Sequence, residues 1–107
     1  MKEHLSQIKT QQFAPFYFCI DIGGYTGVNA ASYEEFLTSI KKVDARSLTF
    51  HLERGDFEKW VSLILKDEKL AKDIGKLRNQ TLVGKALQNR LYNIVAKRLE
   101  QLTTKTQ

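Results

Sequence analysis

The residues best suited to chemistry lie together in one segment, FHLERGDFEKW, which runs from residue 50 to residue 60. It contains His51, Arg54 and Asp56. An imidazole beside a carboxylate can act as a general acid–base pair, because histidine titrates near neutral pH and the carboxylate can orient its ring. At a junction between two helices, however, a histidine more often makes a structural hydrogen bond to a carbonyl or a neighbouring acid. We favour the structural interpretation and assign no catalytic residue; His51, Arg54 and Asp56 are the candidates for an enzyme.

The same segment carries the signals that end one helix and begin the next. Gly55 suits the left-handed position after a helix C-terminus, and Asp56 suits the N-cap of the helix that follows. Arg46 and Arg54 flank this junction and could bind an anion there. Because Asp56 would already occupy the anion-binding position at the helix start, we interpret both arginines as solvated.

Three other features resemble functional motifs but have simpler structural explanations. The segment CIDIGGYT, residues 19–26, resembles the phosphate-binding hairpin of actin-like and Hsp70-like ATPases. Those folds need two lobes to enclose a nucleotide, however, and a sequence of 107 residues is too short to form both. We therefore expect a glycine turn. Cys19 is the only cysteine, and with two histidines it matches no zinc spacing, so we expect a buried structural thiol, no metal and no cofactor. Trp60 and Phe57 lie on one helical stripe, which favours core positions over a stacking platform.

Length and composition indicate one globular domain. The chain has 107 residues, of which 42% are hydrophobic and 27% are charged. These values are typical of a single soluble domain with its own core. No apolar run is long enough for a signal peptide or a membrane span. Together with the single cysteine, this pattern predicts a cytoplasmic protein.

The net charge of +5 is concentrated near the C-terminus. Residues 1–77 contain equal numbers of basic and acidic side chains, whereas residues 78–107 contain six basic residues against Glu100 alone. A basic element of this kind can attract nucleic acid, and its candidate contacts are Lys85, Arg90 and Lys97. On the expected helix, Arg90 and Lys97 share one side while Lys85 lies across it. We therefore expect any nucleic-acid binding to be weak and non-specific.

The hydrophobic pattern predicts a mainly α (α+β) fold, with a short N-terminal β-hairpin followed by about five helices around one core. A strand is expected over 16–21, a glycine turn at 23–24 and a return strand over 25–28. Helices are expected over 32–43, 47–54, 56–65, 67–77 and 81–102. A flexible segment over 1–12 and a tail over 103–107 flank the single globular domain, residues 13–102.

Capping residues support two of these helices. Ser32 and Glu35 form a capping box, in which the serine hydroxyl accepts from a free backbone N–H and the glutamate reaches back. The segment 47–54 is ambiguous, because its apolar and polar residues alternate as they do in a strand. Ser47 as an N-cap and Gly55 as a stop favour a short helix, which is our prediction.

The last expected helix carries a long apolar stripe made by Val83, Leu87, Leu91, Ile94, Val95, Leu99 and Leu102. The other helices are short, so part of this stripe could stay uncovered by the chain's own core, and a second copy would then cover it. Gly84 has no side chain and would let a second backbone approach. We predict a homodimer whose interface includes Gly84, Leu91 and Val95. The alternative is a monomer in which the hairpin and the 32–43 helix cover the stripe.

Several segments resemble a family of small uncharacterised archaeal and bacterial domains. The similarity lies in SYEEFL at residues 32–37, FHLERGDFEKW at 50–60 and DEKLA at 67–71, and it covers residues 13–77. The family is similar in its aromatic N-terminal hairpin and in an FHxxRGDFxxW motif at the junction. No activity is assigned to the family. The resemblance therefore implies a helix at 47–54 and transfers no catalytic or binding residue.

These observations favour a small cytoplasmic protein-interaction or regulatory domain without catalytic activity of its own. We expect its partner to be a second copy of the chain or another protein, and no membrane. The alternative is a nucleic-acid-binding accessory domain that uses the basic C-terminal helix. An enzyme with a His51–Asp56 acid–base pair ranks third.

Overall fold

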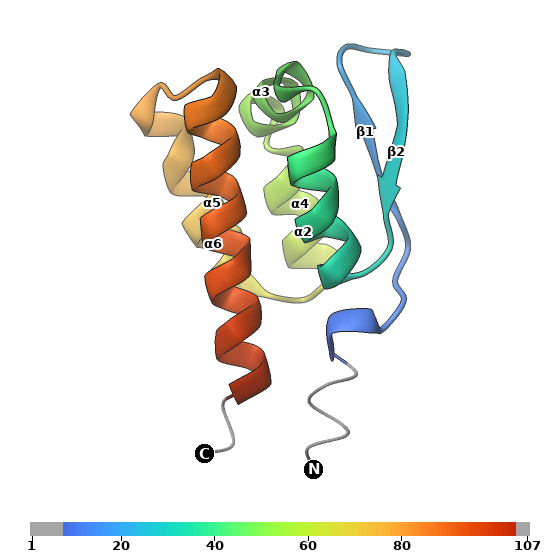
Figure 1. Ribbon diagram of the computed structural model, residues 1–107, viewed down its shortest axis with the longest axis vertical. Helices are drawn as coiled ribbons and strands as arrows, with labels where there is room; N and C mark the ends of the chain where they lie inside the picture. The colour runs from blue at the N-terminus through green and yellow to red at the C-terminus, as the bar shows by residue number, and fades with distance from the viewer. Residues whose placement is uncertain (1–7, 105–107) are drawn as a thin grey trace.

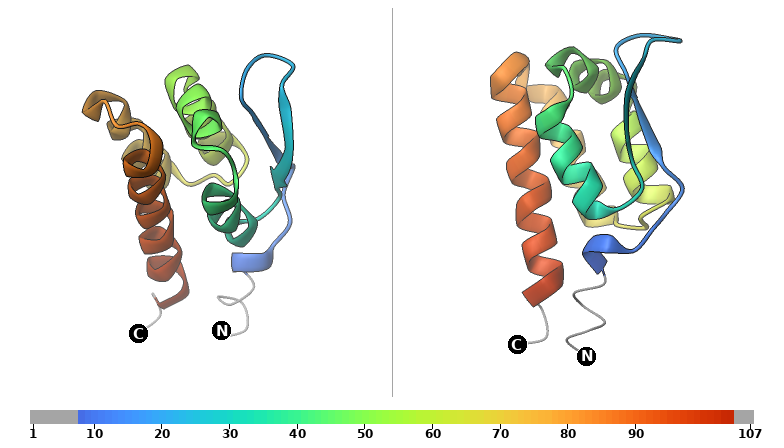
Figure 2. Two further views of the ribbon diagram at one scale, coloured as in Figure 1. Left: turned by 45° about the horizontal axis from the view of Figure 1, so that its top comes forward. Right: turned by 45° about the vertical axis from the view of Figure 1, so that its right-hand side comes forward.

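The computed structural model describes residues 8–104, and Figure 1 shows their arrangement. Strands β1 (Phe16–Cys19) and β2 (Tyr25–Ala30) precede helices α2 (Tyr33–Lys42), α3 (Ala45–Arg54), α4 (Asp56–Leu63) and α5 (Glu68–Gly75), the 3₁₀ helix η1 (Lys76–Gln80) and helix α6 (Gly84–Thr104). The expected fold, mainly helical with an N-terminal hairpin, is confirmed. Three layers are visible in Figures 1 and 2: α5 with α6, then α2 to α4, then the hairpin.

The hairpin turns its aromatic side toward the helices. Phe16 lies opposite Ala30 and Phe18 opposite Val28 in the antiparallel pairing, and both phenylalanines are buried. After Phe18 the register shifts, so that the next residue of β1 pairs with Tyr25. The strand β2 accommodates the shift at Gly27, whose φ of 88° is in the region that favours glycine. The predicted alternation of inward and outward residues in β1 is confirmed.

Side-chain caps set the starts of α2 and α5, and the cap of α2 is the one predicted. The Ser32 hydroxyl accepts a hydrogen bond from the Glu35 N–H at 3.1 Å, and the Glu35 carboxylate accepts one from the Ala31 N–H at 2.8 Å. This reach-back bond goes to one residue before the usual partner in a capping box. Asp67 caps α5, because its Oδ1 accepts from the Leu70 N–H at 3.1 Å.

Residues 47–54 are helical, which confirms our preference over a strand. The helix α3 starts earlier than predicted, because Asp44 and not Ser47 is its N-cap; Asp44 Oδ1 accepts from the Arg46 N–H at 2.8 Å. Ser47 is fully buried in the first turn. Gly55 ends the helix with φ 75°, a conformation that a side chain with a Cβ disfavours.

Helix α6 begins at Gly84 and not at Thr81 as predicted. Thr81 and Gly84 have positive φ angles of 53° and 58°, so the chain turns back between η1 and α6 before the helix starts. The turn makes α5–η1 and α6 antiparallel neighbours (Figure 1). Their relative position creates the groove described below.

The core lies between the hairpin and the helices. Phe16 and Phe18 of β1 pack against Phe36 of α2 and Phe57 of α4, with ring centroids between 5.2 and 6.3 Å apart. On α6 the buried residues are Leu87, Leu91, Val95 and Leu99. Removing these apolar surfaces from water supplies the main driving force for folding. Among residues 8–104, no helix combines the length and the apolar composition needed to cross a membrane.

Candidate functional site: a basic groove beside a structural histidine

His51 is buried where β1, α3 and α4 meet, with an exposed fraction of 5%. Its Nε2 lies 2.9 Å from the backbone nitrogen of Cys19, and its Nδ1 lies 2.8 Å from Oδ2 of Asp56. The ring of Phe16 packs against the imidazole edge to face. The side chain therefore ties the end of β1 to the junction between α3 and α4.

These two hydrogen bonds assign the proton on the imidazole. The Cys19 N–H can only donate, so Nε2 of His51 accepts, and the proton lies on Nδ1, which donates to Asp56. Burial lowers the pKa of His51, and the hydrogen bond and charge of Asp56 offset only part of this effect. A neutral ring with both nitrogens engaged has no nitrogen free to take a proton from a substrate. The arrangement is suited to structure and not to acid–base chemistry.

The prediction that Asp56 caps α4 is wrong. Gly55 occupies the N-cap position, and Asp56 is the first residue of the helix. Its carboxylate accepts instead from His51 and from Nε of Arg54, the latter at 3.0 Å. Burial raises the pKa of Asp56, but the hydrogen bonds from His51 and Arg54 outweigh burial and hold the pKa below its usual value. The three candidate catalytic residues thus lie together as one hydrogen-bonded junction.

Trp60 lies in the core, as predicted. Its exposed fraction is 7%, and its ring packs against Phe16 and Phe36. The indole Nε1 donates to the carbonyl oxygen of Ala14 at 2.8 Å, so that its polar atom is satisfied. Trp60 therefore anchors the segment before β1 on α4 and offers no stacking surface.

No metal centre can be built from residues 8–104, because no group of three or more histidine, cysteine, aspartate or glutamate side chains lies in a suitable arrangement there. Cys19 is only half-buried, which corrects the expectation of a buried thiol. The segment that resembles a phosphate-binding hairpin is a tight turn. In this turn the Gly24 N–H donates to the Asp21 carbonyl and the Ile20 N–H donates to the Gly24 carbonyl, both at 3.0 Å.

A basic groove runs between α5–η1 and α6, and we call it the α5–α6 groove. Its volume is about 270 Å³, and it is lined by Lys69, Asp73, Lys76, Leu77, Gln80, Arg90, Ile94, Lys97, Arg98 and Gln101. Four exposed cations come from both walls: Lys69 and Lys76 from α5–η1, and Arg90 and Lys97 from α6. Two aliphatic side chains give the lining an apolar component.

The charge of the groove is strongly unbalanced. Among residues 8–104, Asp73 is the only acidic residue that lines it, and the carboxylate oxygens of Asp73 lie 3.1 Å from Lys69 Nζ and 3.8 Å from Lys76 Nζ. Within residues 8–104, Arg90 and Lys97 have no ion-pair partner, and Arg90 donates to the Gln80 amide oxygen at 3.0 Å. A concave surface lined by charges of one sign concentrates the electrostatic potential. The groove is therefore suited to an anionic ligand.

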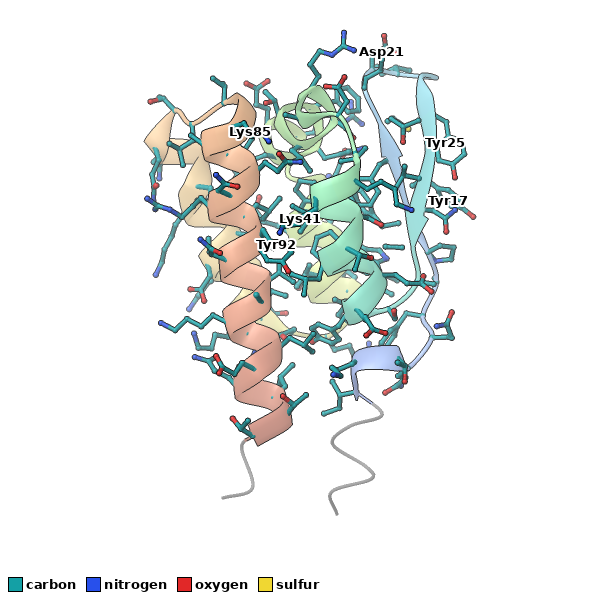
Figure 3. All side chains as sticks on the ribbon, in the orientation of Figure 1. Tyr17, Asp21, Tyr25, Lys41, Lys85 and Tyr92 are labelled. Carbon is teal, nitrogen blue, oxygen red and sulfur yellow. The ribbon has the colours of Figure 1, made fainter. Side chains whose placement is uncertain are left out.

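Two of the three residues predicted to contact nucleic acid, Arg90 and Lys97, line this groove. Lys85 does not, and Figure 3 shows it on the side of α6 that faces α3. Lys69 and Lys76 were not among the predicted contacts, because nothing in the pattern of α6 reveals which helix packs beside it. The sequence did contain one sign of them: Lys69 and Lys76 are seven residues apart and lie on the side of the predicted 67–77 helix opposite its apolar residues.

Behind the groove, Arg98 extends to a buried carboxylate. Its Nε lies 2.9 and 3.1 Å from the two carboxylate oxygens of Asp67, and the side chains are only 17% and 3% exposed. The Tyr33 hydroxyl donates to the same carboxylate at 2.7 Å. Burial raises the pKa of Asp67, but the hydrogen bonds from Arg98, Tyr33 and the Leu70 N–H outweigh burial and lower the pKa overall. Burial, together with Asp67, raises the pKa of Tyr33, whose phenol stays protonated as a donor.

The residues predicted for a dimer interface are separated by the fold. Leu91 and Val95 are fully buried, because α2, α3 and α5 cover the stripe of α6 that we expected to stay open. Only Gly84 lines an open surface, a separate hollow of about 480 Å³ that it shares with Phe50 and Val83. The expected interface on Leu91 and Val95 is therefore closed off by the chain itself. Homodimer formation stays a prediction.

The fold and its groove define a small helical domain with an N-terminal hairpin and a concave basic surface between α5–η1 and α6. The chain belongs to the family of unknown function DUF5752, whose family model matches residues 2–96. This match is longer than the resemblance described under Sequence analysis, which covers residues 13–77. The comparisons with curated proteins and with solved structures found no match.

Proposed function

We propose that this chain is a small cytoplasmic binding domain without catalytic activity, and that it recognises an anionic partner at the α5–α6 groove. One observation carries the proposal: four cations, from α5–η1 on one wall and α6 on the other, line a groove that contains a single carboxylate among the described residues. Charges that the chain does not neutralise itself are available to a partner. The candidate acid–base residues, by contrast, are hydrogen-bonded to one another. The single cysteine is typical of a reducing compartment.

Binding of an anionic partner at the groove should depend on the salt concentration in a characteristic way. A positive groove attracts an anionic partner at long range and accelerates the encounter. Exposed charges are screened over about 8 Å at physiological ionic strength. Binding at the groove should therefore weaken steadily as salt is added, whereas the fold, which depends on buried contacts, should not.

Heparin chromatography with charge-reversal variants tests the proposal. The variant K69E/K97E reverses one cation on each wall of the groove, and the control K42E/K85E changes the net charge equally at exposed sites outside it. We expect the groove variant to elute at clearly lower salt than the control, with thermal melts showing that both are folded. Equal elution of the two variants would mean that net charge alone, and not the groove, holds the polyanion.

Nucleic-acid binding is a second candidate, favoured by the excess of basic residues over 78–107. Lys85 lies outside the groove, so fewer cations act together than the count suggests. We expect non-specific affinity in the range of about 1–100 µM at physiological salt. Titration of duplex and single-stranded oligonucleotides at two salt concentrations measures it. Sub-micromolar affinity that persists at physiological salt would move this function to first place.

A further inference from the structure

We infer that the ligand of the α5–α6 groove is an acidic, amphipathic segment of a partner protein. This inference rests on the proposed function, because it specifies the partner of the same site. Carboxylates of the segment would meet the exposed cations, and its apolar side chains would meet the half-buried Ile94 and the aliphatic stems of the lysines that line the groove. Three properties of the groove support this partner over a nucleic acid.

The first property is the spacing of the cations. Arg90 and Lys97 are seven residues apart on α6 and have no ion-pair partner within residues 8–104. Seven residues of helix rise about 10 Å. Lys69 and Lys76, by contrast, both extend to the carboxylate of Asp73, so their charges lie close together on the opposite wall. A protein segment with carboxylates one heptad apart on a helix, or three residues apart when extended, can meet Arg90 and Lys97 at once.

The second property is the position of Asp73 between Lys69 and Lys76. A nucleic-acid backbone carries a negative charge at every nucleotide and would set a phosphate against this carboxylate. A protein segment can leave a neutral side chain at that point and keep its acidic residues for Arg90 and Lys97. Asp73 therefore favours a ligand whose charges are spaced apart.

The third property is the uncharged part of the lining. The ten residues that line the groove include aliphatic side chains and no aromatic ring. Proteins that bind single-stranded nucleic acid without sequence preference stack bases on aromatic side chains, which are worth about 1–3 kcal/mol per base. The groove cannot supply that energy. Leu77 is already buried in the core, but Ile94 is only half-buried and can instead be covered by an aliphatic side chain of a peptide, which adds apolar contact to the charge pairing.

Three fluorescent probes of equal charge test the inference by anisotropy with the full chain: a peptide of glutamate and leucine with acidic residues one heptad apart, a glutamate–serine peptide with the same spacing, and a single-stranded oligodeoxynucleotide. We expect the glutamate–leucine peptide to bind about tenfold more tightly than the other two, which is the gain from burying one or two aliphatic side chains. The variant R90E/K97E should lose at least about tenfold in affinity, because it sets like charges against the peptide. The control K42E/K85E should lose much less.

The outcomes separate this inference from the proposed function. If the oligonucleotide or the glutamate–serine peptide binds as tightly as the glutamate–leucine peptide, and R90E/K97E still weakens binding more than the control, the amphipathic partner is wrong and the anion-binding groove stands. If no probe distinguishes R90E/K97E from K42E/K85E, both are wrong. Thermal melts of the two variants establish that each is folded before binding is compared.

Discussion

Replacing Asp67 by alanine should destabilise the protein far more than replacing any exposed aspartate. The carboxylate of Asp67 accepts hydrogen bonds from the Arg98 guanidinium, the Tyr33 hydroxyl and the Leu70 N–H. Loss of the helix cap alone costs about 0.5–2 kcal/mol. Leaving the buried Tyr33 hydroxyl without a partner costs about 1–3 kcal/mol. Breaking a buried ion pair by removing one partner typically costs about 3–5 kcal/mol, and we expect Asp67→Ala to fall in this range.

Urea denaturation of four proteins measures this contribution: wild type, Asp67→Ala, Arg98→Met and the double variant. The double variant should lose about 1–3 kcal/mol less than the sum of the single losses, because each single change leaves the other charge buried without a partner. Asp73→Ala is the matched control; this aspartate pairs with exposed lysines, and such pairs contribute at most about 1 kcal/mol. A loss for Asp67→Ala no larger than that for Asp73→Ala, or strict additivity in the double variant, would refute the reasoning.

The same network has a defined dependence on pH. The pKa of Asp67 is lower in the folded protein than the value of about 3.9 expected in the unfolded chain. A depressed carboxyl pKa contributes stability that is complete above the unfolded value and is lost as the pH falls through the folded value. Stability of the wild type should therefore fall steeply at acidic pH. Asp67→Asn should show a shallower fall over the same range.

Three further predictions concern the junction and the core. Long-range proton–nitrogen NMR should show the proton of the buried His51 on Nδ1. Because burial lowers the pKa of His51 in the folded protein, the free energy of unfolding should also fall as the pH drops below the unfolded histidine value of about 6.5. This fall should be smaller in His51→Gln. Trp60 should emit at the short wavelength of a buried indole, and an exposed-type spectrum would contradict its core position. Gly55→Ala should cost about 1–2 kcal/mol in thermal or urea unfolding, since φ is 75° there; a neutral effect would show that this backbone can relax.

The sequence predicts those features whose partners lie within one turn of chain. The Ser32 cap bonds to an N–H group three residues later, and Gly55 ends α3 through its own backbone conformation. Periodicity likewise places Trp60 in the core, because the stripe of a helix is fixed by its own spacing. Each of these predictions needs no knowledge of where the rest of the chain lies.

A local sequence pattern does not show where a distant or competing partner binds a side chain. Asp56 has a suitable residue type and position for a cap, but its carboxylate is bound by His51 and Arg54. Arg98 lies on the apolar stripe of α6 and finds its counter-ion 31 residues earlier in the chain. Neither partner follows from propensity or periodicity. Both interactions obey the general rule that a buried polar group needs a partner. This rule does not say which residue the partner is.

The basic residues of helix α6 have two different roles, which the sequence does not distinguish. Arg98 is held by a buried carboxylate that also receives the Tyr33 hydroxyl, so this cation helps to fix α6 against α5 and α2. Arg90 and Lys97 lie on the open side of the same helix and have no acidic partner within residues 8–104. The buried ion pair sets the position of the wall from which these two cations project. A change at Arg98 would therefore disturb the fold and the groove together, whereas changes at Arg90 and Lys97 can alter binding while the core stays intact.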